Sequence, residues 1–196
     1  MTDFVIENDT LVRFRGESTD VTVPSFVTRI LDHAFYRKNG IERLRLPDGL
    51  REIGDSAFRL ASSVRELIIP DSVTSIGRWA FANCLSLEHI RLPRGLTALP
   101  YGLLEGCYAL TELELPEGLC EIGQSALMRC SSLRSLRLPA SLVSIGDDAL
   151  RDCTHLEEIV CSKRIAPLLT SKVVTCGIYF TSSTMHVRTP PRITVL

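Results

Sequence analysis

Two short segments of the chain come close to the strained turn that presents the nucleophile of many serine hydrolases. They are GDSAF at residues 54–58 and GQSAL at residues 123–127, which place Ser56 and Ser125 at the nucleophile position. That turn ends in glycine, whereas these segments end in Phe58 and Leu127. The serine position also recurs every 23 residues with unrelated side chains, namely His33, Trp79, Gly102 and Asp148. We therefore interpret it as variable surface, and we predict no catalytic residue and no enzymatic activity.

The histidines and cysteines do not have the spacing of a metal site. Five of the seven cysteines recur every 23 residues, at Cys84, Cys107, Cys130, Cys153 and Cys176. Parallel side chains in register do not converge into the tetrahedron that zinc requires. Their separation of ~4.8 Å also exceeds the ~3.8 Å between the Cβ atoms of a disulfide. We predict buried free thiols, with Cys161 in the core and Cys120 alone on the surface, and neither metal nor cofactor.

The cysteine spacing is one column of a repeat that organises most of the chain. Six prolines follow one another at intervals of 23 residues without insertion: Pro24, Pro47, Pro70, Pro93, Pro116 and Pro139. Leucine, isoleucine or valine fills the columns three, six, seventeen and twenty residues after each proline. Such a period indicates a solenoid, in which each repeat forms one coil and buries its apolar columns against the neighbouring coils.

Each repeat is predicted to contain a short strand just before its proline. In VRELII at residues 64–69, the alternation places Leu67 and Ile69 inward, and Glu66 and Ile68 outward. The segment after the proline should cross the coil, and the S-A-F-x-x-C segment should return along the opposite side as a turn or a short helix. Repetition every 23 residues then gives one parallel strand per coil.

One glycine column and the fourth repeat need separate treatment. Gly54, Gly77, Gly123 and Gly146 share a position, which suggests either a positive φ or a close backbone approach. Leu31 and Pro100 occupy the same column in two other repeats. Because proline cannot take a positive φ, the turn at Pro100 is expected to be rebuilt. In the same repeat Leu103 replaces an alanine and Leu104 a phenylalanine, which we interpret as compensated repacking.

The pattern divides a single domain of residues 1–196 into three parts. Residues 1–20 are predicted to form an N-terminal hairpin cap, residues 21–161 the six repeats, and residues 162–196 a degenerate repeat with a C-terminal cap. Residues 162–196 hold five basic side chains and no acidic one, so a docking tail for a partner is an alternative to the cap. The five are Lys163, Arg164, Lys172, Arg188 and Arg192.

Composition restricts the possible partners and location. A net charge of −1 gives no general attraction to nucleic acid or to an anionic membrane. No run approaches the ~18 apolar residues of a membrane span, and the first residues lack the features of a secretory signal. We therefore expect a cytoplasmic protein that is a monomer and binds neither nucleic acid nor membrane.

The columns resemble a known family. LRLPDGLREIGDSAF and LIIPDSVTSIGRWAFANCLSL are similar to the BspA-like leucine-rich repeats, also called the Treponema pallidum type, and FVIENDTLVRFRG is similar to the segment that opens many of them. The resemblance implies an α/β repeat solenoid: a curved right-handed superhelix with a parallel β-sheet on its concave face and turns or short helices on its convex face. It also implies a role in binding other proteins.

The outward positions of the predicted sheet are the main candidate for a binding site, because repeat proteins bind on their extended concave face. The candidate residues are Arg43, Arg45, Glu66, His89, Arg91, Glu112, Glu114 and Arg137. Arg91, Glu114 and Arg137 are expected to lie side by side as mutually paired charges. An alternative patch consists of Trp79, Tyr101 and Tyr108 on the return side. The alternative function is a structural segment of a larger repeat assembly or of a cell-surface adhesin.

Overall fold

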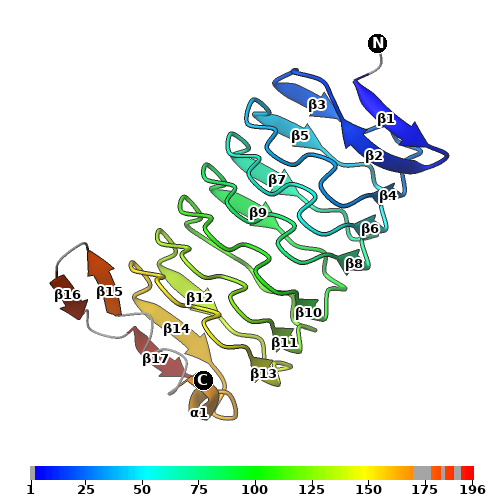
Figure 1. Ribbon diagram of the computed structural model, residues 1–196. Coiled ribbons are helices and arrows are strands. Elements are labelled where there is room, and N and C mark those ends of the chain that lie inside the picture. The colour runs from blue at the N-terminus through cyan, green and yellow to red at the C-terminus, as the bar shows by residue number, and fades with distance from the viewer. Residues whose placement is uncertain (1–2, 170–177, 182–183, 188–190) are drawn as a thin grey trace.

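The coils of the chain stack into an elongated solenoid with three sides (Figure 1). The computed structural model describes residues 3–169, 178–181, 184–187 and 191–196. Most coils contribute a short strand to a first side, and the six repeats contribute a two-residue strand to a second side and a run of turns to a third side. In the fourth repeat the first-side strand is reduced to a single bridge at Glu112. The solenoid predicted from the 23-residue period, and the leucine-rich-repeat type implied by the resemblance, are thereby confirmed.

The first side consists of strands that precede the repeat prolines and of two further strands, β14 (Glu158–Cys161) and β17 (Arg192–Val195), that continue the side beyond the last of these prolines. The strands that precede a proline are β3 (Asp20–Thr22), β5 (Arg43–Arg45), β7 (Glu66–Ile68), β9 (His89–Arg91) and β12 (Ser135–Arg137). The β3–β5, β7–β9, β12–β14 and β14–β17 pairs are parallel, and the repeats pair in register 23 residues apart. The predicted orientation is confirmed, since Leu67 and Ile69 are buried while Glu66 and Ile68 are exposed.

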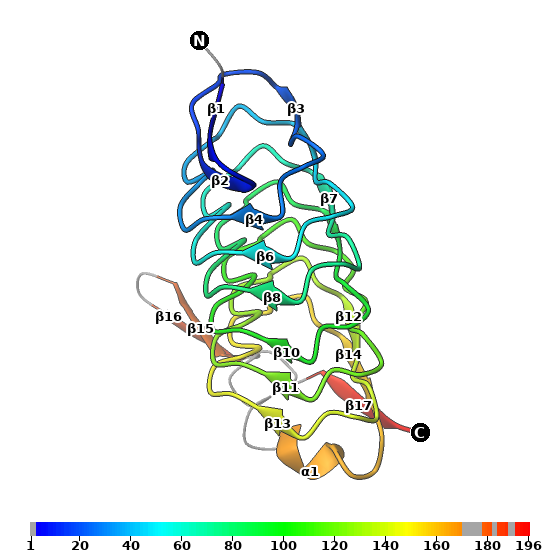
Figure 2. The same cartoon turned by 90° about the vertical axis from the view of Figure 1, so that its right-hand side faces the viewer.

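The second side is a ladder of shorter strands, which faces the viewer in Figure 2. Its members are β4 (Arg29–Ile30), β6 (Glu52–Ile53), β8 (Ser75–Ile76), β10 (Ala98–Leu99), β11 (Glu121–Ile122) and β13 (Ser144–Ile145). At the N-terminal end β2 (Thr10–Phe14) pairs parallel with β4 and antiparallel with β1 (Phe4–Glu7), so a hairpin covers this side of the first coil.

The third side contains turns instead of helices. Each return segment holds two residues with positive φ, one in the column of Ser56 and Trp79 and one in the column of Leu60 and Asn83. Left-handed residues are incompatible with a continuing α-helix, and in the described part of the chain the one helix is α1 (Ala166–Leu169). The expected α/β class with convex helices is therefore wrong, and the turns named as the other possibility are what the third side contains.

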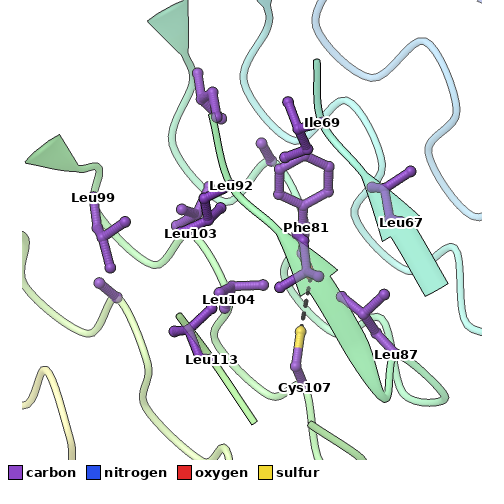
Figure 3. Packing of buried hydrophobic residues seen from close by; sticks show 14 of the residues in the cluster. Leu67, Ile69, Phe81, Leu87, Leu92, Leu99, Leu103, Leu104, Cys107 and Leu113 are labelled. Atoms are coloured by element: carbon purple, nitrogen blue, oxygen red, sulfur yellow. Dashed lines mark hydrogen bonds between the residues drawn. The ribbon is translucent and has the colours of Figure 1, made fainter. Parts of the chain in front are cut away.

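Aromatic and aliphatic columns fill the space between the three sides. Phe14, Phe35, Phe58 and Phe81 stack one above another, with ring centroids 5.3, 4.9 and 5.4 Å apart. In the next coil Leu104 continues the column, and Leu103 beside it is larger than the alanine found at this position in the other repeats. Both leucine side chains are completely buried (Figure 3). The expected exchange of a large for a small residue in one column, and the reverse in the next, is consistent with this packing.

The cysteine column forms its own hydrogen-bonded series inside the core. Cys84, Cys107, Cys130 and Cys153 are buried, and each Sγ donates to a backbone carbonyl of the preceding coil at 3.1–3.3 Å. Figure 3 shows this bond from Cys107 to the carbonyl of Phe81. The predicted burial of these four thiols and of Cys161 is confirmed, as is the exposure of Cys120. Cys176 lies outside the described residues.

The glycine column marks a close approach of neighbouring coils, not a positive φ. None of the four glycines has a positive φ, so that alternative is wrong. A Cβ atom on Gly77 would lie 2.4 Å from the backbone nitrogen of Asp55, and one on Gly146 would lie 2.3 Å from that of Gln124. The absence of a side chain lets the second-side strands come within hydrogen-bonding distance.

Pro100 interrupts the second side without rebuilding its own turn. The N–H of Leu103 donates to the carbonyl of Pro100 at 3.2 Å, as Ala126 does to Gly123, so the expected rebuilding is wrong. In other coils the residue of this column also donates its N–H to the coil before, as Gly123 does to Leu99 at 2.8 Å. Proline has no N–H to donate, so this hydrogen bond is missing at Pro100. Accordingly β8 and β10 are not paired.

The C-terminal residues that the structure describes extend the first side. β17 pairs with β14, and the guanidinium of Arg192 and the hydroxyl of Thr194 both donate to the carboxylate of Glu158. These two hydrogen bonds lower the pKa of Glu158. β15 (Ile178–Thr181) and β16 (Thr184–Val187) form a separate antiparallel hairpin. None of the described helices has the length and apolar character needed to cross a membrane.

Candidate protein-binding face

The eight sequence-predicted residues lie on one face of the molecule. All eight are exposed and point outward from the first side, because strand alternation buries their neighbours Leu44, Leu67, Ile90, Leu113 and Leu136. Each of the eight also lines one of two hollows on this side. We call this surface, from β3 to β14, the strand face.

The first hollow lies over β5 and β7. It has a volume of about 800 Å³, and its lining includes Arg43, Arg45, Glu66 and the half-buried Leu46. The two strands are neighbours, yet they share no backbone hydrogen bond, because the parallel pairs of this side are β3–β5 and β7–β9. The hollow therefore coincides with a break in the strand ladder.

The second hollow extends from β7 and β9 to the fourth repeat. It has a volume of about 670 Å³, and its lining includes His89, Arg91, Glu112, Glu114 and Arg137. Here the ladder is again incomplete, since residues 112–114 contribute a single bridge between His89 and Glu112. Ile68 lines both hollows and is 53% exposed. The sequence places Ile68 outward, but only the structure shows that it stands between two hollows.

The charges on this face pair differently from the sequence expectation. Arg91 does not pair with Glu114; its guanidinium contacts the carboxylate of Asp71 at 2.7 Å. Asp71 also accepts the backbone N–H of Arg94 at 3.0 Å. The expected ladder of Arg91, Glu114 and Arg137 as mutually paired charges is therefore wrong, because the long side chain of Arg91 reaches the loop after Pro70 instead.

The surroundings of Asp71 explain its electrostatics. The hydrogen bond from the backbone N–H of Arg94 lowers the pKa of Asp71, and the nearby guanidinium groups of Arg91 and Arg94 lower it further. Two other arginines of the face are held in the same way, Arg45 by Asp20 at 2.5 Å and Arg65 by Glu88 at 2.8 Å. These carboxylates thus offset part of the arginine charge on the strand face, although Asp20 and Asp71 are each shared by two arginines.

The alternative aromatic patch lies on the third side. The rings of Trp79 and Tyr101 meet edge to face with centroids 4.6 Å apart, and the indole N–H of Trp79 donates to Glu105 at 3.1 Å. Both rings are half-buried, whereas Tyr108 is 42% exposed. The space for the indole is provided by Gly102, since a Cβ there would lie 2.4 Å from the Trp79 ring. Trp79 therefore packs largely within the molecule.

The serines of the near-miss hydrolase motifs are not on the surface. Ser56 and Ser125 are each 5% exposed, so the interpretation of this column as variable surface is wrong for them. Both have a positive φ, but so do His33, Trp79, Gly102 and Asp148 in the same column. The strained backbone is thus a feature of every coil. Among the described residues, no group of three or more His, Cys, Asp or Glu side chains is arranged to hold a metal ion.

A family model and several solved structures match the chain. The model of the BspA type leucine rich repeat region matches residues 13–100 and 51–173, with six copies. A leucine rich cell surface protein from Faecalibacterium prausnitzii is 26% identical with a TM-score of 0.63, over 78% of this chain and 51% of that one. No curated protein matches the sequence.

Two further structures agree with this similarity. The leucine rich repeat protein of Treponema pallidum is 29% identical with a TM-score of 0.52, over 77% of this chain and 62% of that one. A leucine-rich repeat protein from Bacteroides ovatus is 25% identical with a TM-score of 0.52, over 83% of this chain and 57% of that one. The matched part of each of these three structures is between about half and three fifths of its length.

Proposed function

Because the chain belongs to the family of BspA-type leucine-rich repeats, we propose that it is a non-enzymatic module that binds a protein partner through its strand face. Repeat solenoids generally bind along the extended face formed by their strands. Protein interfaces commonly have an apolar centre and a polar rim, with anchor residues held in pockets. The strand face of this chain has two hollows with an exposed apolar residue between them.

The observation that carries the proposal is the position of Ile68. It is 53% exposed, and it lies between hollows of about 800 and 670 Å³. At the other outward positions of β5, β7 and β9 the side chains are charged or histidine. A single apolar residue surrounded by polar ones resembles the centre and rim of a protein interface. On the third side, by contrast, the Trp79 indole already has partners within the molecule.

Binding experiments with three variants test this proposal. The immobilised chain captures partners from an extract of the source organism, and Ile68→Asp should abolish capture because it places a charge at the centre of the interface. Val143→Asp is the matched control, because Val143 is also exposed, at 62%, and does not line either hollow. Capture that survives Ile68→Asp but is lost with Trp79→Ala and Tyr101→Ala together would contradict the strand-face proposal.

A second candidate is adhesion at the cell surface through the same face. The similar protein of Faecalibacterium prausnitzii is described as a cell surface protein, whereas the sequence of this chain leads us to expect the cytoplasm. Brief proteinase treatment of intact cells of the source organism separates the two. Loss of the chain would support adhesion, and protection until the cells are opened would support a cytoplasmic module.

A further inference from the structure

The charged side chains of the two hollows divide unequally into paired and unpaired groups. Arg45, Arg65, Arg91 and Arg94 each contact a carboxylate. Arg43 lies 3.8 Å from Asp20, and Arg137 is the one lining arginine that forms no ion pair with the described residues. Most of the carboxylates that line the hollows, by contrast, are unpaired within the described chain. The carboxylates that line a hollow and form no such pair are Glu42, Asp48, Glu66, Glu112, Glu114 and Glu117.

The unpaired groups determine what a partner meets at this face. An ion pair at contact distance is nearly neutral when seen from several ångströms away, whereas an isolated carboxylate acts over about a Debye length. The strand face carries many arginines, and from the sequence alone these suggest basic bands at Arg43 and Arg91. Asp20 and Asp71 each contact two arginines, so part of the arginine charge remains. The six unpaired carboxylates outnumber it, and the net charge of the face is therefore negative.

Apolar surface accompanies these carboxylates in both hollows. Leu46 is half-buried in the first hollow and Leu115 in the second, with Ile68 between them. The second hollow combines this surface with three unpaired acids of one repeat, namely Glu112, Glu114 and Glu117. The arrangement suits a chain segment that has basic residues on either side of an apolar one.

We propose that the occupant of the strand face is a cationic segment of a different protein, whose Lys or Arg side chains lie over the unpaired carboxylates and whose apolar residue contacts Ile68. This inference rests on the proposed function and specifies the chemistry of the partner. Nucleic acid and acidic peptides would be repelled by the same charges. The occupant that must be distinguished is a second copy of this chain, because residues 162–196 are themselves basic and contain no acid.

A selection from random peptides tests the proposal with a defined probe. A library of random 12-residue peptides is selected on the whole immobilised chain, and the recovered peptides are measured by fluorescence anisotropy. We expect them to be rich in Lys and Arg with an apolar residue between. The combined change Glu112→Gln, Glu114→Gln and Glu117→Gln should weaken their binding about tenfold. The matched control is Glu7→Gln, Glu17→Gln and Glu121→Gln, which removes three exposed acids away from the hollows and should leave binding unchanged.

The possible outcomes separate this inference from the proposed function. Binding that is lost with Ile68→Asp, but by peptides that are acidic or neutral, would overturn the inference and leave the strand face as the site. Binding that survives both Ile68→Asp and the triple glutamine change would overturn both. Light scattering provides the remaining check. A dimer that forms with rising concentration and disappears in the triple variant would identify a second copy as the occupant and overturn the inference.

Discussion

The coils before Pro100 and the coils after it share one repeat but are held together differently. Before Pro100 the core has stacked phenylalanines, and the second side is a continuous ladder from β2 to β8. After it the same column holds Leu104, Leu127 and Leu150, and a new ladder runs from β10 to β13. The apolar columns and the backbone hydrogen bonds of the third side continue across the junction, whereas the second-side ladder does not. Core packing and the third side therefore hold the two groups of coils together at this step.

The largest effect is expected from removing one ring of the phenylalanine stack. Phe58→Ala should lower the free energy of unfolding by ~3–5 kcal/mol, because the ring is buried between Phe35 and Phe81. Urea unfolding followed by circular dichroism measures the change. Phe26→Ala is the control, since Phe26 is 58% exposed and should change stability little. Equal losses in the two variants would show that the stack is not what supports these coils.

The corresponding test beyond the junction uses two adjacent residues of the fourth repeat. Leu113→Ala should cost ~2–5 kcal/mol, because Leu113 is buried in the core. Glu114→Ala should cost well under ~1 kcal/mol, because its side chain is exposed. Both are read from urea midpoints. A small loss for Leu113→Ala would indicate that the coils beyond Pro100 do not depend on core packing.

Two substitutions in the glycine column test the second-side ladder: one disturbs a step where the strands are paired, and the other restores an N–H group at the break. Gly77→Ala should destabilise the protein by ~1–3 kcal/mol, because the new Cβ would lie 2.4 Å from the backbone nitrogen of Asp55. Pro100→Gly should change stability by less than ~1 kcal/mol, because a regained hydrogen bond is offset by the flexibility of glycine. If the variant restores the second-side ladder, the backbone N–H groups of Thr97 and Ala98 should exchange with solvent more slowly than in the unchanged protein. Unchanged exchange there would mean that Pro100 is not the cause of the break.

The last prediction concerns the reactivity of the cysteines, for which we expect the smallest effect on stability. A bulky thiol reagent should modify Cys120 rapidly in the native protein and the buried thiols only after denaturation. Burial raises the pKa of Cys84 to about 12. The stability contributed by the buried thiols is therefore complete below pH ~9 and is lost as the pH rises towards 12, because only the unfolded chain then ionises. Rapid modification of more than one of the described cysteines in the native state would contradict this burial.

The inward columns were predictable from the sequence because burial leaves little choice of residue. Leu67, Phe58 and Cys107 lie where the 23-residue period places them, since each must fill the same volume against the next coil. The turn type of the third side was less certain. The residues with positive φ include Leu60 and Trp79, and neither type indicates a left-handed backbone.

The pairing of surface charges was not predictable in the same way. Arg91 and Glu114 occupy adjacent outward positions, yet the guanidinium of Arg91 reaches Asp71 in the loop after Pro70. A long exposed side chain chooses among several carboxylates by small differences in free energy, and sequence spacing does not resolve these. The effect of Pro100 was similarly hidden, because the sequence shows a missing N–H but not which hydrogen bond it would have made.

The ladder on the third side gives the junction a mechanical asymmetry. The backbone N–H groups of Trp79, Phe81 and Asn83 donate across it at 3.0, 3.1 and 2.7 Å, while the second side has no backbone bond at this step in the described chain. At this step of the described chain the coils are thus joined by backbone hydrogen bonds on the third side but not on the second side. A load that bends the stack is therefore expected to separate the coils at this step on the second side, where β8 and β10 are not paired. The second hollow is lined by repeats on both sides of Pro100, so we expect such bending to change its width.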